Sequence, residues 1–311
     1  LIADKWVYLT IFNVLFIVGL IFFGKGDEVG SRSWYRFAGI GVQPSEIVKV
    51  IFIVLMAKQI SNYKEQRTLN KFPSIMKLGL HWALYFGLIT VIPNDLGSAL
   101  IVLAIFVIML ICAGIAWYWM AAAAAAVAAM IPLFWNFLLK DYQKKRILAP
   151  YIPDVVDPTG QGITWQTNHC KDALASGRWT GVGFGEGSFA QSSYNARHTD
   201  CIFASIGEEL GMIACIAIIV LLSIIIIRCC VIGLRSGSPF GMLICFGVAA
   251  ALAFQTFVNI GMCIGITPVV GITLPFFSYG GSSIVAMYAA VGLVSGVKYR
   301  PKPRQNFLQY Q

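Results

Sequence analysis

Residues 210–227 read LGMIACIAIIVLLSIIII, a run of eighteen residues without one charged side chain. An α-helix needs roughly 20 apolar residues to cross the hydrocarbon core of a bilayer, so this run predicts a membrane-spanning helix. The rest of the chain has a similar composition, since 58% of its 311 residues are hydrophobic and 12% are charged. A soluble domain carries about 25% charged residues, so the bilayer is the expected solvent of this chain.

Seven further apolar segments lie on either side of this run. Together they give eight candidate spans, at Trp6–Gly24, Ile47–Ile60, Leu78–Ile92, Ser98–Ile115, Trp117–Leu139, Leu210–Ile227, Gly241–Met262 and Ser282–Val297. Helices are expected because every backbone polar group in the bilayer must be satisfied internally. The predicted fold class is therefore all-α, a polytopic transmembrane bundle of about eight helices that forms one domain over residues 1–311. The alanine run at 121–126 is expected to favour close packing between helices.

The basic residues lie mainly between the apolar segments, and the net charge is +9. They follow the second, sixth and eighth segments, at Lys58, Lys64, Arg67, Lys71 and Lys77, at Arg228 and Arg235, and at Lys298, Arg300, Lys302 and Arg304. If all eight segments span, these loops share one side, which the positive-inside rule places in the cytoplasm with Lys5 and the C-terminus. Such a distribution favours orientation signals and lipid or phosphate contacts over binding to nucleic acid.

Three connections then lie on the outer side, at residues 25–45, 140–200 and 263–281. The second is a large extracytoplasmic loop within the domain, and its five aromatic residues between 165 and 194 argue against disorder. The third contains ITPVVGITLPFFSYGGSS at 266–283, which is rich in Gly and Pro and yet apolar. This pattern predicts re-entrant backbone that is buried in protein at membrane depth.

Motifs in these outer connections resemble those of the SEDS family, the RodA/FtsW/SpoVE group. QPSEIVK at 43–49 resembles the family element QPSE-x-x-K, and RHTDCIFA at 197–204 with GEELG at 207–211 resembles the signature HTDFIFA…EELG. NIGM at 259–262, PVVG at 268–271 and LPFFSYGGSS at 274–283 resemble the final loop of the family. The similarity runs from about Gly30 to Lys298 and leans toward RodA. The family has ten membrane helices, so this chain is expected to lack the first two.

The chain departs from the family pattern at three places. It has PNDLGS at 93–98 where the family commonly has QPDLGT, His169-Cys170 where many members have a Gln-Ser pair, and Cys201 where Phe is usual. These differences put the loop contacts in doubt more than the reaction.

The resemblance implies a peptidoglycan glycosyltransferase in the bacterial cytoplasmic membrane. Such an enzyme polymerises lipid II, an undecaprenyl-pyrophosphate-linked donor, into β-1,4-linked glycan during cell elongation, division or sporulation. The implied partners are a class B penicillin-binding protein, lipid II and membrane lipids. Two alternatives stay open. Intramembrane charges and a broken Gly/Pro-rich segment are also features of transporters, such as a lipid II flippase. A non-catalytic scaffold that activates a partner synthase is the other.

Asp200 stands at the outer membrane face, where the long loop ends and a helix begins. Its simplest structural interpretation is a helix N-cap, and the resemblance implies the catalytic residue. A carboxylate near an apolar surface has a raised proton affinity, which suits a general base acting on the attacking sugar hydroxyl. The leaving pyrophosphate needs positive charge or a metal, so a divalent cation, Mg²⁺ or Mn²⁺, is also expected.

Six residues are candidates for substrate binding, namely Glu46, Lys49, Arg146, Arg197, Ser278 and Tyr279. Glu46 and Lys49 lie three apart on one helix face, and they form either an internal ion pair or a phosphate contact. Arg197 either contacts phosphate or pairs with Asp200, and the basic run 144–146 suits lipid headgroups equally well. The glycines at 280–281 fit a turn in a re-entrant loop better than a phosphate-binding loop, because the Gly-Lys-Ser ending of that motif is missing.

Asp95, Glu208 and Glu209 are candidates for a structural role or for a cation site. Asp95 opens a helix, and a capping role is favoured. Glu208 and Glu209 either bind a cation with Asp200 or hydrogen-bond the final loop, and the second role is favoured. The eight cysteines are expected to be small apolar fillers because no CxxC spacing repeats.

Overall fold

The computed structural model of this chain describes residues 6–24, 33–37, 40–139 and 141–299. Lys5, Arg300, Lys302 and Arg304, which entered the orientation argument, lie outside these ranges. The long helices are α1 (Trp6–Val18), α3 (Pro44–Glu65), α4 (Phe72–Val91), α5 (Leu96–Ala113), α6 (Trp117–Leu133), α11 (Ile202–Leu234), α12 (Pro239–Ile264) and α13 (Gly281–Lys298). The short helix α2 (Leu20–Phe23) extends α1. The predicted all-α bundle is confirmed.

Seven helical segments in the described part of the chain are long and apolar enough to cross a membrane. They cover the predicted spans except the second, where α3 occupies residues 44–65 and is longer than the predicted 47–60. The composition of α3 is less apolar because it carries charged residues at both ends. It is nevertheless a central helix, since most of its side chains from Val48 to Ile60 are buried.

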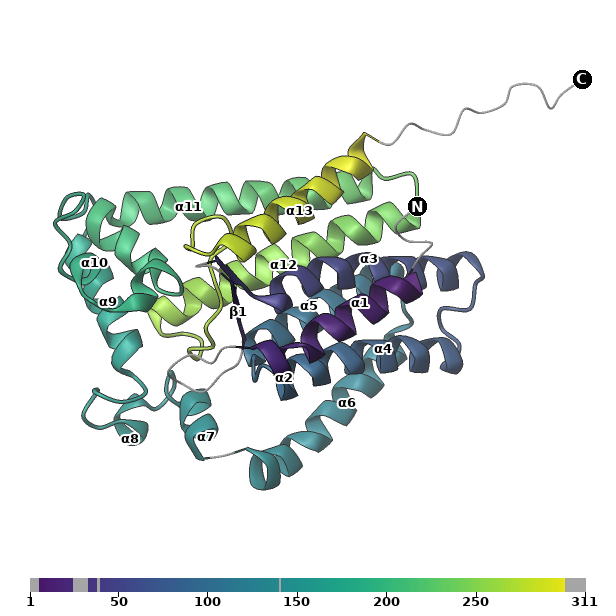
Figure 1. The fold of residues 1–311 in the computed structure, drawn as a ribbon, viewed down its shortest axis with the longest axis horizontal. Coiled ribbons are helices and arrows are strands. Elements are labelled where there is room, and N and C mark those ends of the chain that lie inside the picture. The colour runs from purple at the N-terminus through teal and green to yellow at the C-terminus, as the bar shows by residue number, and fades with distance from the viewer. Residues whose placement is uncertain (1–5, 25–32, 38–39, 140, 300–311) are drawn as a thin grey trace, which may run out of the picture.

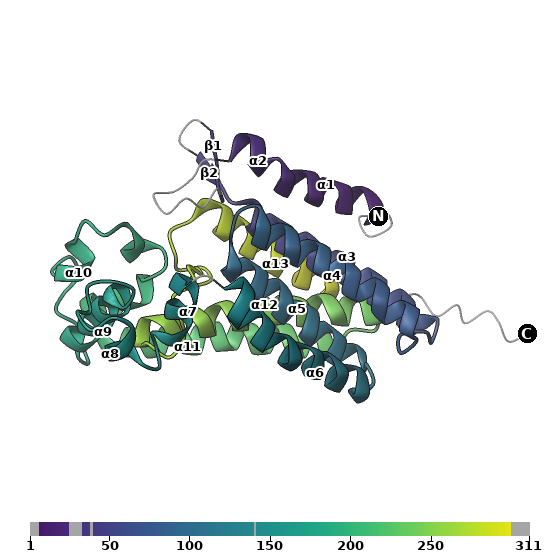
Figure 2. The same ribbon diagram turned by 90° about the horizontal axis from the view of Figure 1, so that it is seen from below.

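The long helices run side by side along one axis, and their connections gather at two opposite ends (Figure 1). The α3–α4 and α11–α12 turns lie at one end together with the C-terminal end of α13. The other end carries residues 33–37 and 40–43 and the connections at 141–201 and 265–280 (Figure 2). This segregation of basic turns from long connections agrees with the topology expected from the sequence.

α12 forms the centre of the bundle, and two thirds (67%) of its most apolar stretch is buried. It packs on α3, α5, α11 and α13. Small residues such as Gly247 and Ala251 allow this close approach, since a Cβ at Gly247 would already touch Ile53 and Met109. Dispersion and close packing rather than water exclusion hold helices together in lipid, so small residues at these contacts are favourable.

α6 differs from the other long helices because none of its described side chains is buried. It leans away from the bundle in Figure 1. The alanines at 121–126 are all exposed, so the close packing predicted for them is wrong. Small side chains permit close packing, but they do not supply a partner helix.

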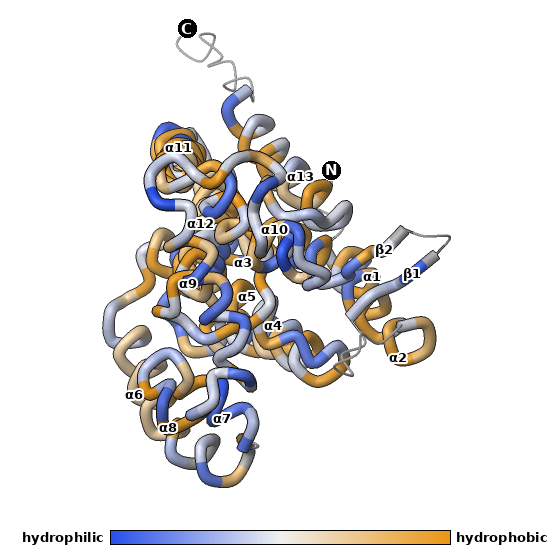
Figure 3. The backbone as a smooth tube through the Cα atoms, turned by 90° about the vertical axis from the view of Figure 1, so that its left-hand side faces the viewer, coloured by the Kyte–Doolittle hydropathy of each residue, from blue (hydrophilic) through white to orange (hydrophobic). Residues whose placement is uncertain are grey.

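The long connection is folded into four short helices and a 3₁₀ turn, in agreement with the aromatic content of the loop. These are α7 (Asp141–Leu148), α8 (Pro153–Val156), α9 (Trp165–Gly177), α10 (Ser188–Gln191) and η3 (Asn195–His198). Figure 3 looks onto this end and shows hydrophilic stretches in α7, α9 and α10. An antiparallel hairpin of β1 (Tyr35–Phe37) and β2 (Ile40–Val42), not expected in an all-α fold, lies at the same end.

α11 is broken at Gly211, whose φ of 77° and ψ of −178° are not helical. The loop at 178–183 fills the break with four backbone hydrogen bonds. Val182 and Gly183 donate to the carbonyls of Glu208 and Glu209, and the amides at 212 and 213 donate to the carbonyls at 178 and 179. The helix therefore keeps its backbone groups paired across the break.

The final connection, residues 265–280, contains no helix or strand, and Ile272, Leu274 and Ser278 in it are buried. The predicted irregular backbone inside protein is therefore observed in the structure. This connection passes between the end of α12 and the start of α13, where it contacts the residues before α11.

Candidate active site

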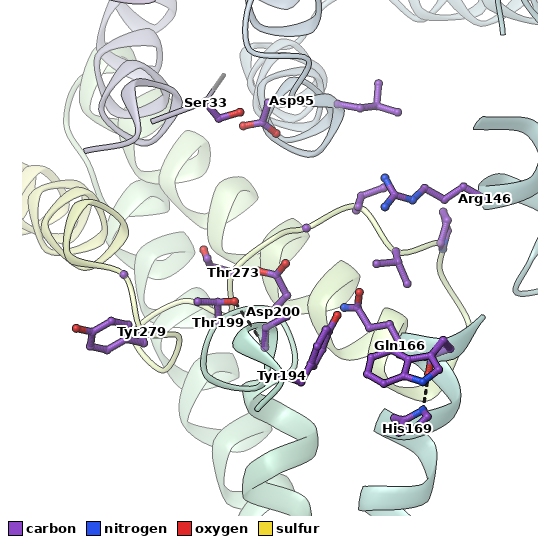
Figure 4. A pocket seen from close by; sticks show the side chains of 18 of the residues that line it. Ser33, Asp95, Arg146, Gln166, His169, Tyr194, Thr199, Asp200, Thr273 and Tyr279 are labelled. Carbon is purple, nitrogen blue, oxygen red and sulfur yellow. Dashed lines mark hydrogen bonds between the residues drawn. The ribbon is translucent and has the colours of Figure 1, made fainter. Parts of the chain in front are cut away.

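A cavity of about 1710 Å³ opens at the end of the bundle that carries the long connections. Its walls come from segments far apart in the chain, and Figure 4 shows their side chains pointing into one space. The polar and aromatic lining residues include Arg36, Asp95, Arg146, Trp165, Gln166, His169, Asp172, Tyr194, Thr199, Asp200, Thr273 and Tyr279. The cavity is thus a meeting point of the three outer connections.

The backbone before α11 is fixed through four successive carbonyl groups. The Arg197 carbonyl accepts from Ser205 Oγ at 3.0 Å, and the His198 carbonyl accepts from the Tyr279 amide at 2.8 Å. Ser278 Oγ donates to the Thr199 carbonyl at 2.6 Å. Asn259 Nδ2 donates to the next carbonyl, that of residue 200, at 2.9 Å. The donors come from α11, the final loop and α12, so three elements fix this turn.

Asp200 uses its main chain for these contacts and turns its side chain to the cavity (Figure 4). Among the described residues, no ion pair joins its carboxylate to a basic group. Burial raises the pKa of Asp200 to about 7, with smaller contributions from the Cys201 thiol and the Asp95 carboxylate, whereas a hydrogen bond from Thr199 opposes the rise. A carboxyl group with a pKa near neutrality can both accept and return a proton.

Arg146 lies on α7 and points into the same cavity (Figure 4). It is exposed and belongs to the basic run 144–146, in which Lys144 lies 3.9 Å from the exposed carboxylate of Asp141. The cavity therefore presents a guanidinium and a carboxylate from different elements to one space. This combination suits a substrate that carries both a sugar hydroxyl and a phosphate.

Tyr279 lines the cavity with a side chain that is 80% exposed, and its role in binding stays a prediction. Ser278 is buried and does not line the cavity. Its hydroxyl accepts from the Leu274 amide at 2.7 Å and donates to the Thr199 carbonyl, so it supports the site from behind. Gly280 has an extended backbone at the start of α13, and the role of the glycine-rich turn stays a prediction.

Arg197 does not line the cavity, and it forms no ion pair with Asp200 in the described structure. Its Nε donates to His198 Nε2 at 2.9 Å. Of the two roles considered for Arg197, the ion pair with Asp200 is therefore absent from the described structure, and the phosphate contact stays a prediction. η3 ends at His198, and Thr199 has a non-helical φ of −106° and ψ of −87°, so no helix continues from Arg197 to Asp200.

Glu46 and Lys49 form a buried ion pair with Nζ and Oε1 2.8 Å apart. Their side chains are 4% and 1% exposed, and neither lines the cavity. Of the two roles considered from the sequence, the internal pair describes these contacts. A direct contact with substrate stays a prediction.

Asp95 caps α5, as the sequence indicated. Its Oδ1 accepts from the Ser98 amide at 2.9 Å, and its Oδ2 accepts from the hydroxyls of Ser45 and Ser98 and from the amide group of Gln43. Because Ser45 and Gln43 lie at the start of α3, the same carboxylate joins the ends of two helices. Its oxygens are therefore already well supplied with donors.

Glu208 and Glu209 bind the long connection rather than the final loop, which corrects the predicted contact. Glu208 accepts from Ser188 Oγ and from the amides of Phe189 and Ala190, all between 3.0 and 3.1 Å. Glu209 accepts from the amide of Gly185 at 3.0 Å. The final loop lies on the other side of the cavity, so helix α10 and the loop before it are the nearer donors.

The comparisons with known proteins agree with this architecture. The family model of the FtsW/RodA/SpoVE cell cycle proteins matches residues 2–302. The chain belongs to this family. It is 33% identical to the peptidoglycan glycosyltransferase MrdB of Escherichia coli K12 over 95% of this chain and 78% of that protein. It is also 33% identical to a probable peptidoglycan glycosyltransferase FtsW of Geobacter metallireducens, over 94% of this chain and 76% of the other.

Solved structures of FtsW/RodA/SpoVE-like proteins share this fold. A chain of a peptidoglycan synthase complex that coordinates polymerization and crosslinking superposes with a TM-score of 0.79, at 26% identity over 96% of this chain and 83% of that one. The rod shape determining protein RodA of Thermus thermophilus gives a TM-score of 0.66 at 24% identity, over 94% and 76% of the two chains. The predicted family, with its lean toward RodA, and the predicted glycosyltransferase function are supported by these relatives.

The family resemblance drew attention to the turn at Asp200 but not to the wall that faces it. Gln166, His169 and Asp172 line the cavity from α9. The aromatic residues of the loop were the available signal, since Trp165 and Tyr194 are in edge-to-face contact at 4.9 Å and shape this wall. The i, i+3 and i, i+6 spacing of the three polar residues becomes informative once α9 is recognised as a helix.

A divalent cation finds no protein-only cage in the described residues, which contain no group of three or more His, Cys, Asp or Glu side chains placed to hold a metal. The oxygens of Asp95 and Glu208 already accept several hydrogen bonds. These side chains thus do not form a binding site for a resident metal ion. The predicted Mg²⁺ or Mn²⁺ requirement stays a prediction.

Proposed function

We propose that this cavity polymerises lipid II, with Asp200 as the general base. The observation that supports it is a carboxylate with a pKa near 7, unpaired with any described basic group, on a turn fixed by four backbone contacts. General bases are most effective when their pKa lies near the working pH. Fixing the main chain also holds the carboxylate in one place, which lowers the entropic cost of the reaction.

In the proposed reaction, the sugar hydroxyl of the acceptor donates its proton to Asp200 and attacks the anomeric carbon of the donor. The bond from that carbon to the pyrophosphate oxygen breaks, and the polyprenyl pyrophosphate leaves with the electron pair. Arg146 lines the same cavity from α7 and offers a planar guanidinium to the leaving phosphates. Tyr279, which also lines the cavity, offers an exposed ring to a sugar face.

The proposed orientation places the cavity on the outer face of the bacterial cytoplasmic membrane and the C-terminus in the cytoplasm. The grouping of Lys64, Arg67, Lys71 and Arg235 at the end opposite the cavity supports it. We further propose a class B penicillin-binding protein as partner. A similar solved chain comes from a complex that coordinates polymerization and crosslinking, which supports this choice.

The test is polymerisation of labelled lipid II by the purified protein, with and without the partner, in Mg²⁺, Mn²⁺ or a chelator. Asp200→Asn removes the base and keeps the shape of the side chain. Asp154→Asn is the matched control, because Asp154 is an exposed carboxylate on α8 at the same end that does not line the cavity. Thermal unfolding and gel filtration should first verify that both variants are folded.

Polymer from the wild type and from Asp154→Asn, with none from Asp200→Asn, is the expected result. Equal polymer from all three would exclude Asp200 as the base. Lipid II transfer between leaflets without polymer would favour the flippase. Activation of a partner synthase by Asp200→Asn at the wild-type level would favour the scaffold. Loss of polymer on chelation would show that a divalent cation enters with the substrate.

A further inference from the structure

Three cysteines that are far apart in the sequence meet directly behind the cavity wall. Cys170 lies on α9, Cys201 is the residue before α11, and Cys263 lies near the C-terminal end of α12. All three are free thiols, and all are at most 1% exposed. They belong to one buried cluster, here called the thiol cluster. Its members come from α9, from the residue before α11 and from α12, and these three helices pack on one another.

The thiol cluster is connected through side-chain contacts to the cavity and to Asp200. Each of the three thiols is within hydrogen-bonding contact of the other two. Gln166, which lines the cavity, donates to Cys201 Sγ at 3.2 Å. Cys263 Sγ lies 3.8 Å from the carbonyl oxygen of Asp200. One layer of side chains therefore separates the sulfur atoms from the cavity.

The hydrogen bonds within the cluster make the three sulfur atoms chemically unequal. Contacts from Cys170 and Cys263, with a smaller one from Gln166, lower the pKa of Cys201. The contact with Cys201 raises the pKa of Cys170, which keeps its proton. A thiolate is the nucleophilic form of cysteine, and a second thiol beside it can resolve an oxidised sulfur.

We infer that Cys201 and Cys170 form a peroxide-sensitive pair that inactivates the site by forming a disulfide. This inference rests on the proposed function for its effect on activity. The Cys201 thiolate attacks one oxygen of hydrogen peroxide, the O–O bond breaks, and the sulfenic acid forms as hydroxide leaves. The Cys170 sulfur then attacks Cys201, the S–O bond breaks, and the S–S bond forms. Two thiols and one peroxide give one disulfide and two waters.

Cys170 is the expected resolving thiol because α9 lies outside the membrane spans and can approach α11. A disulfide bond is about 2 Å long, so the two sulfur atoms must move together from a hydrogen-bonding distance. Cys201 follows Asp200 directly, and a displacement of one is passed on to the other. A misplacement of about 1 Å can cost on the order of 100-fold in rate.

The experiment exposes the purified wild-type protein to hydrogen peroxide, blocks the remaining thiols, and maps disulfides by mass spectrometry. Polymerisation of lipid II is measured before treatment, after it, and after addition of a thiol reductant. Cys170→Ser removes the resolving thiol. Cys215→Ser is the matched control, because Cys215 is buried in the same hydrophobic cluster but bonds only to the Phe203 carbonyl among the described contacts.

We expect a 170–201 disulfide in the wild type and in Cys215→Ser, with polymerisation lowered about 10-fold or more and restored by the reductant. Cys170→Ser should keep its activity in peroxide. A 201–263 disulfide, no disulfide, or equal inhibition of Cys170→Ser would overturn the inference. If Cys170→Ser does not fold, Cys170→Ala takes its place in the activity test, and the disulfide map of the wild type tests the 170–201 pairing directly. The map needs no activity, so a protein without polymerase activity would refute the proposed function and leave this test intact.

Discussion

Replacing Asp200 with Asn should stop catalysis and stabilise the fold, because the same low-polarity surroundings that suit a base disfavour a buried charge. The pKa of Asp200 rises from 3.8 to about 7 on burial. The folded protein then holds this proton more tightly than the unfolded chain, so its free energy of unfolding falls as the pH rises from 3.8 to 7. Asn carries no charge and escapes this loss.

The magnitude follows from the same pKa. A rise from 3.8 to about 7 corresponds to about 4 kcal/mol of unfolding free energy at pH 8. Asp200 is partly exposed to the cavity, so solvent screening reduces the gain to about 2 kcal/mol, or on the order of 5 °C in Tm. At pH 5 the gain should be about a third as large, because the wild-type carboxyl is then mostly protonated.

The assay is thermal unfolding of wild type and Asp200→Asn in detergent at pH 5 and pH 8, beside polymerisation rates of the wild type from pH 5 to pH 9. The rate should rise about tenfold for each pH unit up to 7 and then level off. A Tm difference that is zero, or equal at both pH values, would show that the carboxylate is not held in a low-polarity site. A rate that stays flat between pH 5 and pH 7 would refute the raised pKa.

Three further predictions concern the residues that support the site. Lys49→Met should lower the unfolding free energy by about 3–5 kcal/mol because it leaves Glu46 buried and unpaired. The double variant Glu46→Leu, Lys49→Met should regain most of this free energy. A double variant that is folded but inactive would assign the pair to substrate binding. Asn259→Leu should cost about 1–3 kcal/mol in thermal unfolding and lower the polymerisation rate, since the Asp200 carbonyl loses its donor; unchanged kinetics would contradict this. Gly211→Ala should lower the unfolding free energy by about 1–3 kcal/mol, because a φ of 77° with an extended ψ is open only to Gly. Thermal unfolding measures this change, and an unchanged Tm would show that the break in α11 can close.

Hydropathy was sufficient to predict the bundle and the grouping of its connections, because the bilayer imposes the length and polarity of each span. The exposed alanines at 121–126 show the limit of this argument, since composition describes what a helix surface permits and not which helix meets it. The break at Gly211 was also hidden, because the apolar run 210–227 is continuous in sequence. Only the loop at 178–183, folded against the helix, makes the break visible.

The site was predictable where its residues are neighbours in sequence and obscure where the fold assembles them. Asp200 stands in a recognisable motif and lines the cavity, whereas Glu46 and Lys49, which share a helical spacing, form a buried pair that does not line it. The thiol cluster has members at 170, 201 and 263, separated by 31 and 62 residues, and no local spacing connects them. The three cysteines come together only because α9, α11 and α12 pack on one another, and a single sequence does not show this packing.

The arrangement around Asp200 explains how one residue can be held firmly and still serve as a base. Had its carboxylate accepted the hydrogen bonds that fix the turn, those bonds would have stabilised the charged form and lowered its pKa. Asn259 instead donates to the carbonyl of Asp200, and Ser278 to the carbonyl before it. Position is therefore set by the main chain and proton affinity by the cavity, so the two can be changed separately. Asn259→Leu should displace the carboxylate, whereas Asp200→Asn should leave the turn in place and remove the base.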